Sequence, residues 1–383
     1  MAEGSLIGWL DQPGYRPWTL NPGIGCTPRS TGCRSCFAPR SAIRQAHYEG
    51  RGGIVAKDDA GRTVWTGKVI TFPERLERPL RTKTPHMIFV NALMELFDPQ
   101  VSREFIDKVW QMMAATPQHI YVIFSKLAKR MHDIVTAMVA KYGILPNVWL
   151  GASVENQRYA QIRLPWLFRT PAAIRIASCE PLLGPVRLDS IPLGNGRFMN
   201  ALDGRIIRTV RGVLTADPER SDVHLDWVIV GGESGRRDDV RPMHPQWARD
   251  LRDQASAAGI AFFFKQWGNW APAPWQVPLC DPATGWQGTD EELAAAKLAA
   301  EKVGATHAYP VWAHRYEWMI TEATGKPWST ERKALADNEP HAPMRFFPGK
   351  SAGYELDGRP WQQWPSVDGR IVEATPGELV PSA

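Results

Sequence analysis

Six short apolar segments, separated by amphipathic helical patterns, follow one another between residues 86 and 268 of the 383-residue chain. Each is nearly continuous in hydrophobicity and rich in β-branched or aromatic residues, which is typical of parallel strands buried on both faces. Strands that alternate with helices predict βαβ units and a parallel sheet. The segments are HMIFVN (86–91), HIYVIFSK (119–126), NVWLGASVE (147–155), AAIRIASCE (172–180), LDWVIVGGES (225–234) and IAFFFKQWG (260–268).

A further strand near residues 15–20 brings the predicted units to six or seven, which indicates an α/β fold with a full or partial (β/α) barrel over residues 1–268. A doubly wound open sheet is the alternative, because the sequence does not fix the strand order. Segments 49–85 and 185–224 interrupt the alternation of strands and helices and are predicted to be insertions. Residues 269–383, rich in Pro, Gly and Trp, are predicted to form an irregular extension packed on the barrel.

The composition, 44% hydrophobic and 22% charged, is that of a globular protein. The first residues lack a basic stretch followed by a long apolar run, so we expect no signal peptide. No segment approaches the roughly 18 uninterrupted apolar residues of a membrane span. We therefore expect a cytoplasmic protein without a membrane partner, in which thiols stay reduced. Five cysteines, an odd number, make a disulfide framework the weakest explanation of the thiols.

Three of the cysteines, Cys26, Cys33 and Cys36, are spaced C-x6-C-x2-C in a Pro/Gly-rich loop after the first predicted strand. Three thiolates are one short of the four ligands of a closed zinc site or an ordinary iron–sulfur cluster. His47 is close enough in sequence to complete a zinc site, whereas a three-thiolate [4Fe–4S] cluster leaves one iron open for catalysis. The predicted position of the loop at the carboxyl end of a strand favours the cluster over zinc.

Polar and acidic residues follow the predicted strands, at the edge where βα folds bind ligands. A single glutamate after a strand is commonly a charge at the N-terminus of the next helix. Four glutamates, each after a different strand and with serine and lysine nearby, favour a pocket lined by these side chains. A Gly-Gly pair permits a ligand to approach the backbone. The candidate binding residues are Asn91, Glu95, Ser153, Glu155, Ser178, Glu180, Gly231, Gly232 and Glu233; Glu155, Glu180, Lys126 and Lys265 are the candidate catalytic residues.

Several motifs span most of the chain: NP-x-x-GC-x6-C-x2-CFA, IFVNALMELF, VWLGASVE, ASCEPLLGP, DWVIVGGESG followed by RPMHP, FFKQWG, and GK-x-AG-x-x-LDGR-x-W. Together they resemble a family of phage and prophage proteins of unknown function that is related to radical S-adenosylmethionine (SAM) enzymes. The chain departs from that pattern at Leu20, Phe37, Cys179 and SKLA (125–128), where relatives carry Thr-Lys-Arg-Pro. Its first cysteine spacing is also longer than the C-x3-C-x2-C that is usual in radical-SAM enzymes.

The resemblance implies a radical-SAM type of barrel whose three loop cysteines ligate a [4Fe–4S] cluster, while Cys179 and Cys280 do not. It implies that SAM binds the fourth iron and is cleaved to methionine and a 5′-deoxyadenosyl radical, which abstracts hydrogen from the substrate. An electron donor (a reductase or flavodoxin-like protein) and, by association with phage, a nucleotide, DNA or tRNA substrate are the implied partners. For SAM, the methionyl end would be met by Asn91 and Glu95. The ribose or the substrate would be met by Ser153, Glu155, Ser178 and Glu180, and the adenine by Gly231, Gly232 and Glu233. An anionic substrate would be bound by Lys126 and Lys265, unless these lysines pair with the glutamates.

Two other classes of function are open. A zinc-stapled nucleic-acid-binding phage protein would use the Trp-rich tail and the basic segments ERLERPLRTK and RIIRTVRG, and the net charge of +5 is compatible with it. The strand-end carboxylates would repel phosphate and count against it. A barrel hydrolase or glycosidase would use paired strand-end glutamates and would make the cysteines incidental.

Overall fold

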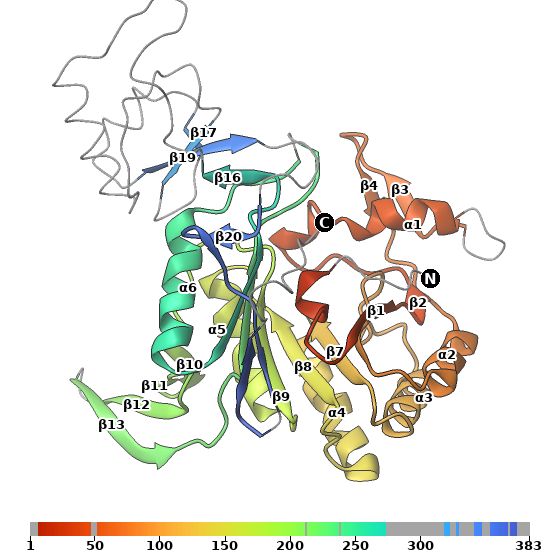
Figure 1. Cartoon of the computed structure of the whole chain (residues 1–383), viewed down its shortest axis with the longest axis horizontal. Helices are drawn as coiled ribbons and strands as arrows, with labels where there is room; N and C mark the ends of the chain where they lie inside the picture. Colours follow the sequence, from red (N-terminus) through yellow and green to blue (C-terminus); the bar gives the residue numbers. More distant parts are fainter. Residues whose placement is uncertain are drawn as a thin grey trace, which may run out of the picture.

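The computed structural model describes residues 7–46, 52–210, 213–236, 239–272, 318–321, 327–328, 341–346, 353–366 and 368–373. Its centre is a sheet of seven strands, which all run parallel to their neighbours (Figure 1). In spatial order the strands are β1 (Arg16–Leu20), β6 (His86–Val90), β7 (Ile120–Ser125), β8 (Val148–Ser153), β9 (Ile174–Cys179), β14 (Trp227–Gly231) and β15 (Ala261–Gln266).

The strand order decides between the predicted folds. Neighbours in the sheet are also successive parallel strands along the chain, so the sheet winds in one direction only. A doubly wound sheet would reverse its order at a switch point, so that alternative is wrong. Among the residues that the structure describes, no pairing joins β1 to β15, and the sheet is therefore a partial barrel rather than a closed one. The predicted α/β fold with a partial barrel is confirmed.

Four helices lie on the outer face of the sheet, each between two successive strands: α3 (Arg103–Ala114), α4 (Ala128–Tyr142), α5 (Gln157–Arg169) and α6 (Pro245–Ala257) (Figure 1). Three of them begin at a side chain that accepts a backbone N–H of the first turn, as a helix N-cap does. These caps are Ser102 for α3, Asn156 for α5 and His244 for α6. The helices bury their apolar stripes against the sheet. None of the helices in the described part of the chain has the length and apolarity to span a bilayer.

Successive residues of a strand point to opposite faces, and this alternation divides the apolar residues into two cores. Outward-facing residues such as Tyr121 and Phe262 pack with the helices. The inner, concave face is filled by Trp149, Trp227 and Phe263, together with Trp9 of the short helix η1 (Gly8–Leu10) and Trp364 of β22 (Gln363–Pro365). This aromatic filling lies toward the amino ends of the strands. The inward positions at the carboxyl ends are polar.

The two predicted insertions contain antiparallel strands. In the first, β3 (Val55–Lys57) pairs with β4 (Thr63–Trp65), and β5 (Ile70–Thr71) pairs with β2 (Gly23–Ile24), next to the cysteine loop. It ends with η3 (Pro73–Leu76) and the short α2 (Glu77–Arg81). The second insertion is a four-stranded antiparallel sheet, drawn in green at the lower left of Figure 1: β10 (Ile191–Gly194), β11 (Arg197–Met199), β12 (Arg205–Val210) and β13 (Val213–Arg220).

The predicted extension 269–383 is described only in part. One antiparallel sheet contains β16 (Trp270–Pro272), β17 (Trp318–Thr321), β18 (Pro327–Trp328) and β19 (His341–Phe346). Two further pairs follow, β20 (Glu355–Leu356) with β21 (Arg359–Pro360), and β22 with β23 (Ile371–Glu373). The backbone N–H of Phe264 in β15 donates to the carbonyl of Trp361 at 2.8 Å, so this part of the extension packs on the barrel.

Candidate functional site

The cysteine loop starts at the end of β1 and lies at the carboxyl edge of the sheet. The N–H of Gly25 donates to the carbonyl of Leu93 at 2.9 Å, which ties the loop to the segment after β6. Gly25 has a φ of +105°, and an added Cβ would lie 1.9 Å from the carbonyl oxygen of Lys68. Only glycine fits this close approach to the first insertion. The turn delivers Cys26 to the edge where ligands bind in βα folds.

The three loop cysteines are free, partly buried thiols that lie near one another. Cys33 is in the short helix η2 (Thr31–Cys33), and Cys36 precedes α1 (Ala38–Ala46). Cys26 and Cys36 pack against a small core made by α1 and the first insertion. Burial raises the pKa of Cys26, and the charges of Glu95, Cys33 and Cys36 raise it further. A set of three thiolates here would therefore need a cationic partner to be stable.

The two metal hypotheses differ in the ligands that they need beside the three cysteines. Within the described ranges, no three Cys, His, Asp or Glu side chains are arranged to hold a metal ion. His47, the predicted fourth zinc ligand, and Cys280 lie outside those ranges. Thiolates that ligate a cluster bind different irons and need not converge on a single point. Thiolates are ligands of zinc as well as of iron–sulfur clusters, so the zinc site and the cluster both stay hypotheses.

Glu155, just after β8, is the centre of a buried polar network below the cysteine loop. Its side chain is fully buried, and it accepts the N–H of Gly32 at 2.8 Å and the hydroxyl of Ser30. Lys126 Nζ lies 2.7 Å and Arg163 Nη1 3.4 Å from its Oε1. Burial by itself would raise the pKa of Glu155, but the Lys126 ammonium and the hydrogen bonds outweigh it and lower the pKa to about 2.

A second carboxylate, Glu233 after β14, reaches the same loop through an arginine. Glu233 is buried and accepts the backbone N–H of Arg241 at 2.8 Å and its Nε at 2.9 Å. The Nη2 of Arg241 donates to the carbonyl of Thr31 at 2.9 Å. The Ser35 hydroxyl donates to the carbonyl of Asp239 in the segment that also carries Arg241. The loop is therefore attached to two strand ends, those of β8 and β14.

Asn91 and Glu95, after β6, lie on the other side of Cys26. Glu95 is buried and accepts the Ser125 hydroxyl and the Lys126 N–H, both at 2.9 Å. Burial raises its pKa despite these hydrogen bonds. Asn91 accepts the N–H of Met94 at 2.9 Å, whereas its buried Nδ2 has no hydrogen-bond partner among the residues that the structure describes. A buried donor without a partner is a group that a bound ligand could satisfy.

A second polar group lines the inner face of the middle strands. Ser153 and Ser178 are neighbours in the register of β8 and β9. Lys265 Nζ lies 3.1 Å from Glu180 Oε2, while the buried Oε1 of Glu180 has no hydrogen-bond partner in the described part of the chain. An added Cβ on Gly231 would lie 2.7 Å from that Oε1, so this glycine makes room for the carboxylate. Of the two roles open to Lys126 and Lys265, an anionic substrate or pairing with the glutamates, the structure shows the pairing.

The structure also shows which predicted neighbours are apart. Cys179, on a strand whose inner face carries Ser178 and Glu180, points outward and is fully buried in the helix-side core. The alternation of the strand puts its thiol on the face opposite to Ser178 and Glu180. Gly232 serves backbone packing, because an added Cβ would lie 2.0 Å from the carbonyl oxygen of Trp267.

Three residues of the site were not predicted from the sequence. Arg163 lies inside α5, where an arginine normally marks a solvated face. Asp98 is buried near Cys26 and contributes to the raised pKa of that thiol. Arg241 is the first residue of the RPMHP motif, which carries the family resemblance. That motif was the one available signal.

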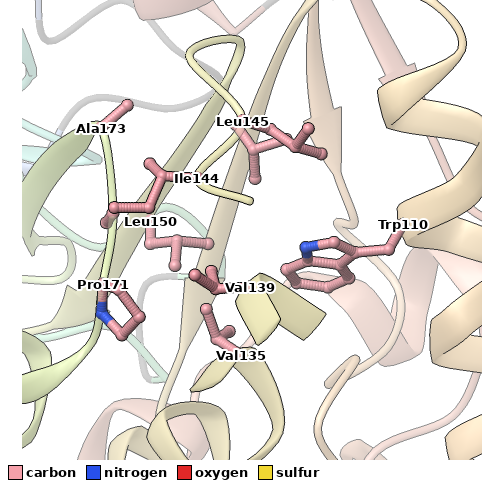
Figure 2. A pocket seen from close by; sticks show the side chains of 10 residues that line it. Trp110, Val135, Val139, Ile144, Leu145, Leu150, Pro171 and Ala173 are labelled. Carbon is pink, nitrogen blue, oxygen red and sulfur yellow. The ribbon is translucent and has the colours of Figure 1, made fainter. Parts of the chain in front are cut away.

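A hollow drawn in Figure 2 lies elsewhere, at the amino ends of β8 and β9 on the helix side. Its lining is apolar, with Trp110, Val135, Ile144, Leu150 and Pro171 among the side chains that surround it. No titratable side chain lines it. It is a packing gap between α3, α4 and the sheet rather than a second candidate site.

Comparison with known proteins places the chain in a family. No curated protein matches its sequence. A family model described as "Protein of unknown function (DUF5131)" matches residues 5–365. Because the match covers nearly the whole chain, the protein belongs to this DUF5131 family of proteins of unknown function.

Proposed function

We propose that this protein is an iron–sulfur enzyme of the radical-SAM type, which cleaves SAM reductively and starts radical chemistry on a nucleotide or nucleic-acid substrate. One observation carries the proposal: three free thiols share one loop, which is docked on the carboxyl edge of a partial parallel barrel. βα folds bind their ligands at this edge. The resemblance to phage proteins supports the substrate class by association. A reductase or flavodoxin-like protein would supply the electron.

Cys26, Cys33 and Cys36 would hold the [4Fe–4S] cluster. When bound, the cluster and SAM supply electron transfer and radical formation, which amino-acid side chains do not provide. The protein's part is to hold the three thiolates in a partly buried loop and to line the space beside them. Burial raises the pKa of the Cys26 thiol, and Glu95 and the two other thiols raise it further, so a positively charged occupant would stabilise the thiolates.

Two buried atoms without hydrogen-bond partners are the best candidates to contact SAM or the substrate. Asn91 Nδ2 is a donor and suits a carboxylate; Glu180 Oε1 is an acceptor and suits an ammonium or a hydroxyl. Ser153 and Ser178, on the inner face beside Glu180, suit hydroxyl groups of the ribose. Because Glu155 already accepts hydrogen bonds from several protein donors, we assign it a supporting role rather than a ligand contact.

The same network argues against the hydrolase alternative. A general acid needs a pKa near the working pH. With a pKa lowered to about 2, Glu155 is ionised at neutral pH and cannot be the general acid. Its side chain is fully buried and its oxygens are bound by Gly32 and Lys126, so it is not free to attack a substrate as the nucleophile either. The hydrolase alternative pairs Glu155 with Glu180, and only Glu180 is then left for catalysis. A glycosidase mechanism needs both.

Anaerobic reconstitution of the full chain with iron and sulfide tests the proposal. We expect a brown protein with about four iron atoms per chain, which forms 5′-deoxyadenosine from SAM when reduced. Cys26→Ser, Cys33→Ser or Cys36→Ser should abolish the visible absorption, whereas Cys179→Ser should retain it. A colourless protein that binds one zinc would contradict the proposal, as would equal bleaching by Cys179→Ser.

A further inference from the structure

We infer that residues 30–32, between the first two cysteines, are gripped by a two-sided clamp in which Glu155 and the Glu233–Arg241 pair set the position of the cysteine loop. The inference deepens the proposed function, and its importance for a cluster rests on that proposal. The clamp itself is defined by contacts within the protein. Glu155, Glu233 and Arg241 are positioning residues in this account.

The first side of the clamp is steric as well as polar. Glu155 accepts the N–H of Gly32 at 2.8 Å, the hydroxyl of Ser30, and that of Thr31 at 3.4 Å. An added Cβ on Gly32 would lie 2.7 Å from Glu155 Cδ. The φ of Gly32 is not in the left-handed region, so the glycine is required for space and not for its backbone conformation. No larger residue fits here without displacing the loop or the carboxylate.

The Glu155 carboxylate cannot easily move aside for a larger residue at position 32, because two cationic side chains hold it in place. Lys126 follows β7, and its Nζ lies 2.7 Å from Glu155 Oε1. Arg163 of α5 lies 3.4 Å from the same oxygen and also donates to the carbonyl of Ser153 at 2.8 Å. A buried carboxylate with these partners is costly to move, since any new position leaves charges unpaired.

The second side of the clamp, at the end of β14, holds the same segment through Thr31. Arg241 Nη2 donates to the carbonyl of Thr31 at 2.9 Å while its Nε donates to Glu233 at 2.9 Å. Glu233 is fixed in turn, because the backbone at Gly268 is so close that an added Cβ there would lie 2.1 Å from the Glu233 carbonyl oxygen. The clamp therefore joins β8 and β14, which flank β9, through one short segment of the loop.

The clamp explains the long spacing between Cys26 and Cys33. Six residues separate Cys26 from Cys33, and the last three of them are the clamped ones. Cys33 follows directly and ends the short helix that begins at Thr31. The position of its sulfur therefore depends on the clamp. Cys26, tied to the segment after β6 through Gly25, is positioned independently.

Thiol reactivity in the full-length, metal-free, reduced protein tests the clamp without any cluster. The variants are Gly32→Ala, Glu155→Gln and Arg241→Gln. The matched controls are Gly52→Ala, where an added Cβ meets nothing within 4 Å, and Glu77→Gln, in an exposed ion pair with Arg81. The rate of alkylation by iodoacetamide is followed by mass spectrometry. Trypsin separates the three cysteines, because Arg29 and Arg34 lie between them.

We expect alkylation of Cys33 to become about tenfold faster in each clamp variant, the factor that corresponds to about 1.4 kcal/mol of lost docking free energy. The buried Cys179 should keep its slow rate, as should both thiols in the controls. Unchanged Cys33 rates in all three variants would overturn the inference. Equal acceleration of Cys33 and Cys179 would also overturn it, because the contacts would then stabilise the whole fold and not the loop.

A second readout separates this inference from the proposed function. After reconstitution, the clamp variants should show a changed electron paramagnetic resonance (EPR) signal or a lower iron content, while the control variants match the natural protein. If the natural protein takes up no cluster, the proposed function fails. The clamp is still tested in that case, because the alkylation rates are measured on the metal-free protein.

Discussion

At the scale of single residues, the site depends on how buried charges are compensated. Glu155 is fully buried yet ionised, because Lys126 and Arg163 face it and the loop donates hydrogen bonds to it. Glu95, close by, forms no ion pair with any described residue and takes hydrogen bonds from Ser125 and the Lys126 N–H instead. Burial raises its pKa. Two neighbouring glutamates thus have pKa values that are shifted in opposite directions.

The lowered pKa of Glu155 predicts a pH dependence of stability. Its pKa is about 2 in the folded protein, against an ordinary value of 4.5. A group whose pKa is depressed by folding contributes stability that is present above the unfolded pKa and is lost as the pH falls through the folded pKa. We therefore expect the urea midpoint of the metal-free protein to fall between pH values of about 4.5 and 2. Glu155→Gln should show a distinctly smaller fall over that window. An identical fall in the variant would mean that Glu155 is not the group responsible.

Residue partners were harder to predict than residue positions. The sequence placed Glu155, Glu180 and Glu233 at strand ends, and they lie at the carboxyl edge of the sheet. It could not tell that Glu155 faces the cysteine loop while Glu180 faces Lys265. Such pairings depend on the path of the loop across the edge. Periodicity along one strand carries no information on that path.

At the scale of elements, the predicted strands were found because each combines continuous hydrophobicity with a polar ending. All six residues of β8 and all five of β14 are buried, as expected of strands covered on both faces. The strand order and the openness of the barrel could not be predicted. They depend on what fills the inner face, and Trp364, more than 350 residues after Trp9, packs there with it.

The Gly-Gly pair after β14 gives a prediction at this scale. An added Cβ on Gly232 would lie 2.0 Å from the backbone oxygen of Trp267, an obstacle that cannot rotate away. Gly232→Ala should therefore lower the free energy of unfolding by about 1–3 kcal/mol, the usual cost of overpacking. Urea denaturation followed by circular dichroism measures it, with Gly52→Ala as the control. A change as small as that of the control would mean that the ends of β14 and β15 are loosely joined.

At the scale of the whole molecule, the amino- and carboxyl-terminal segments together fill the concave face. Trp364 Nε1 donates to the carbonyl of Trp9 at 2.8 Å, and its ring lies 5.3 Å from that of Phe263. Both tryptophans are almost completely buried. The late segment is therefore part of the barrel core. The family match, which extends to residue 365, includes it.

Removal of the Trp364 indole ring should destabilise the entire fold. Trp364→Ala is expected to cost about 3–5 kcal/mol, as large-to-small substitutions of buried aromatic residues do. Ile371→Ala, in the neighbouring strand β23 and 38% exposed, should cost about 1 kcal/mol or less. Urea unfolding of both variants gives the comparison. Similar small losses would show that the late segment is only loosely attached to the core.

The central claim is that the three loop cysteines hold a cluster with an open iron that binds SAM. The most direct measurement is the EPR spectrum of the reconstituted, dithionite-reduced protein, recorded before and after addition of SAM. We predict the signal of a reduced [4Fe–4S] cluster, with a change in its g-values once SAM is present. A protein without a cluster signal, or one whose signal is unaffected by saturating SAM, would contradict the account.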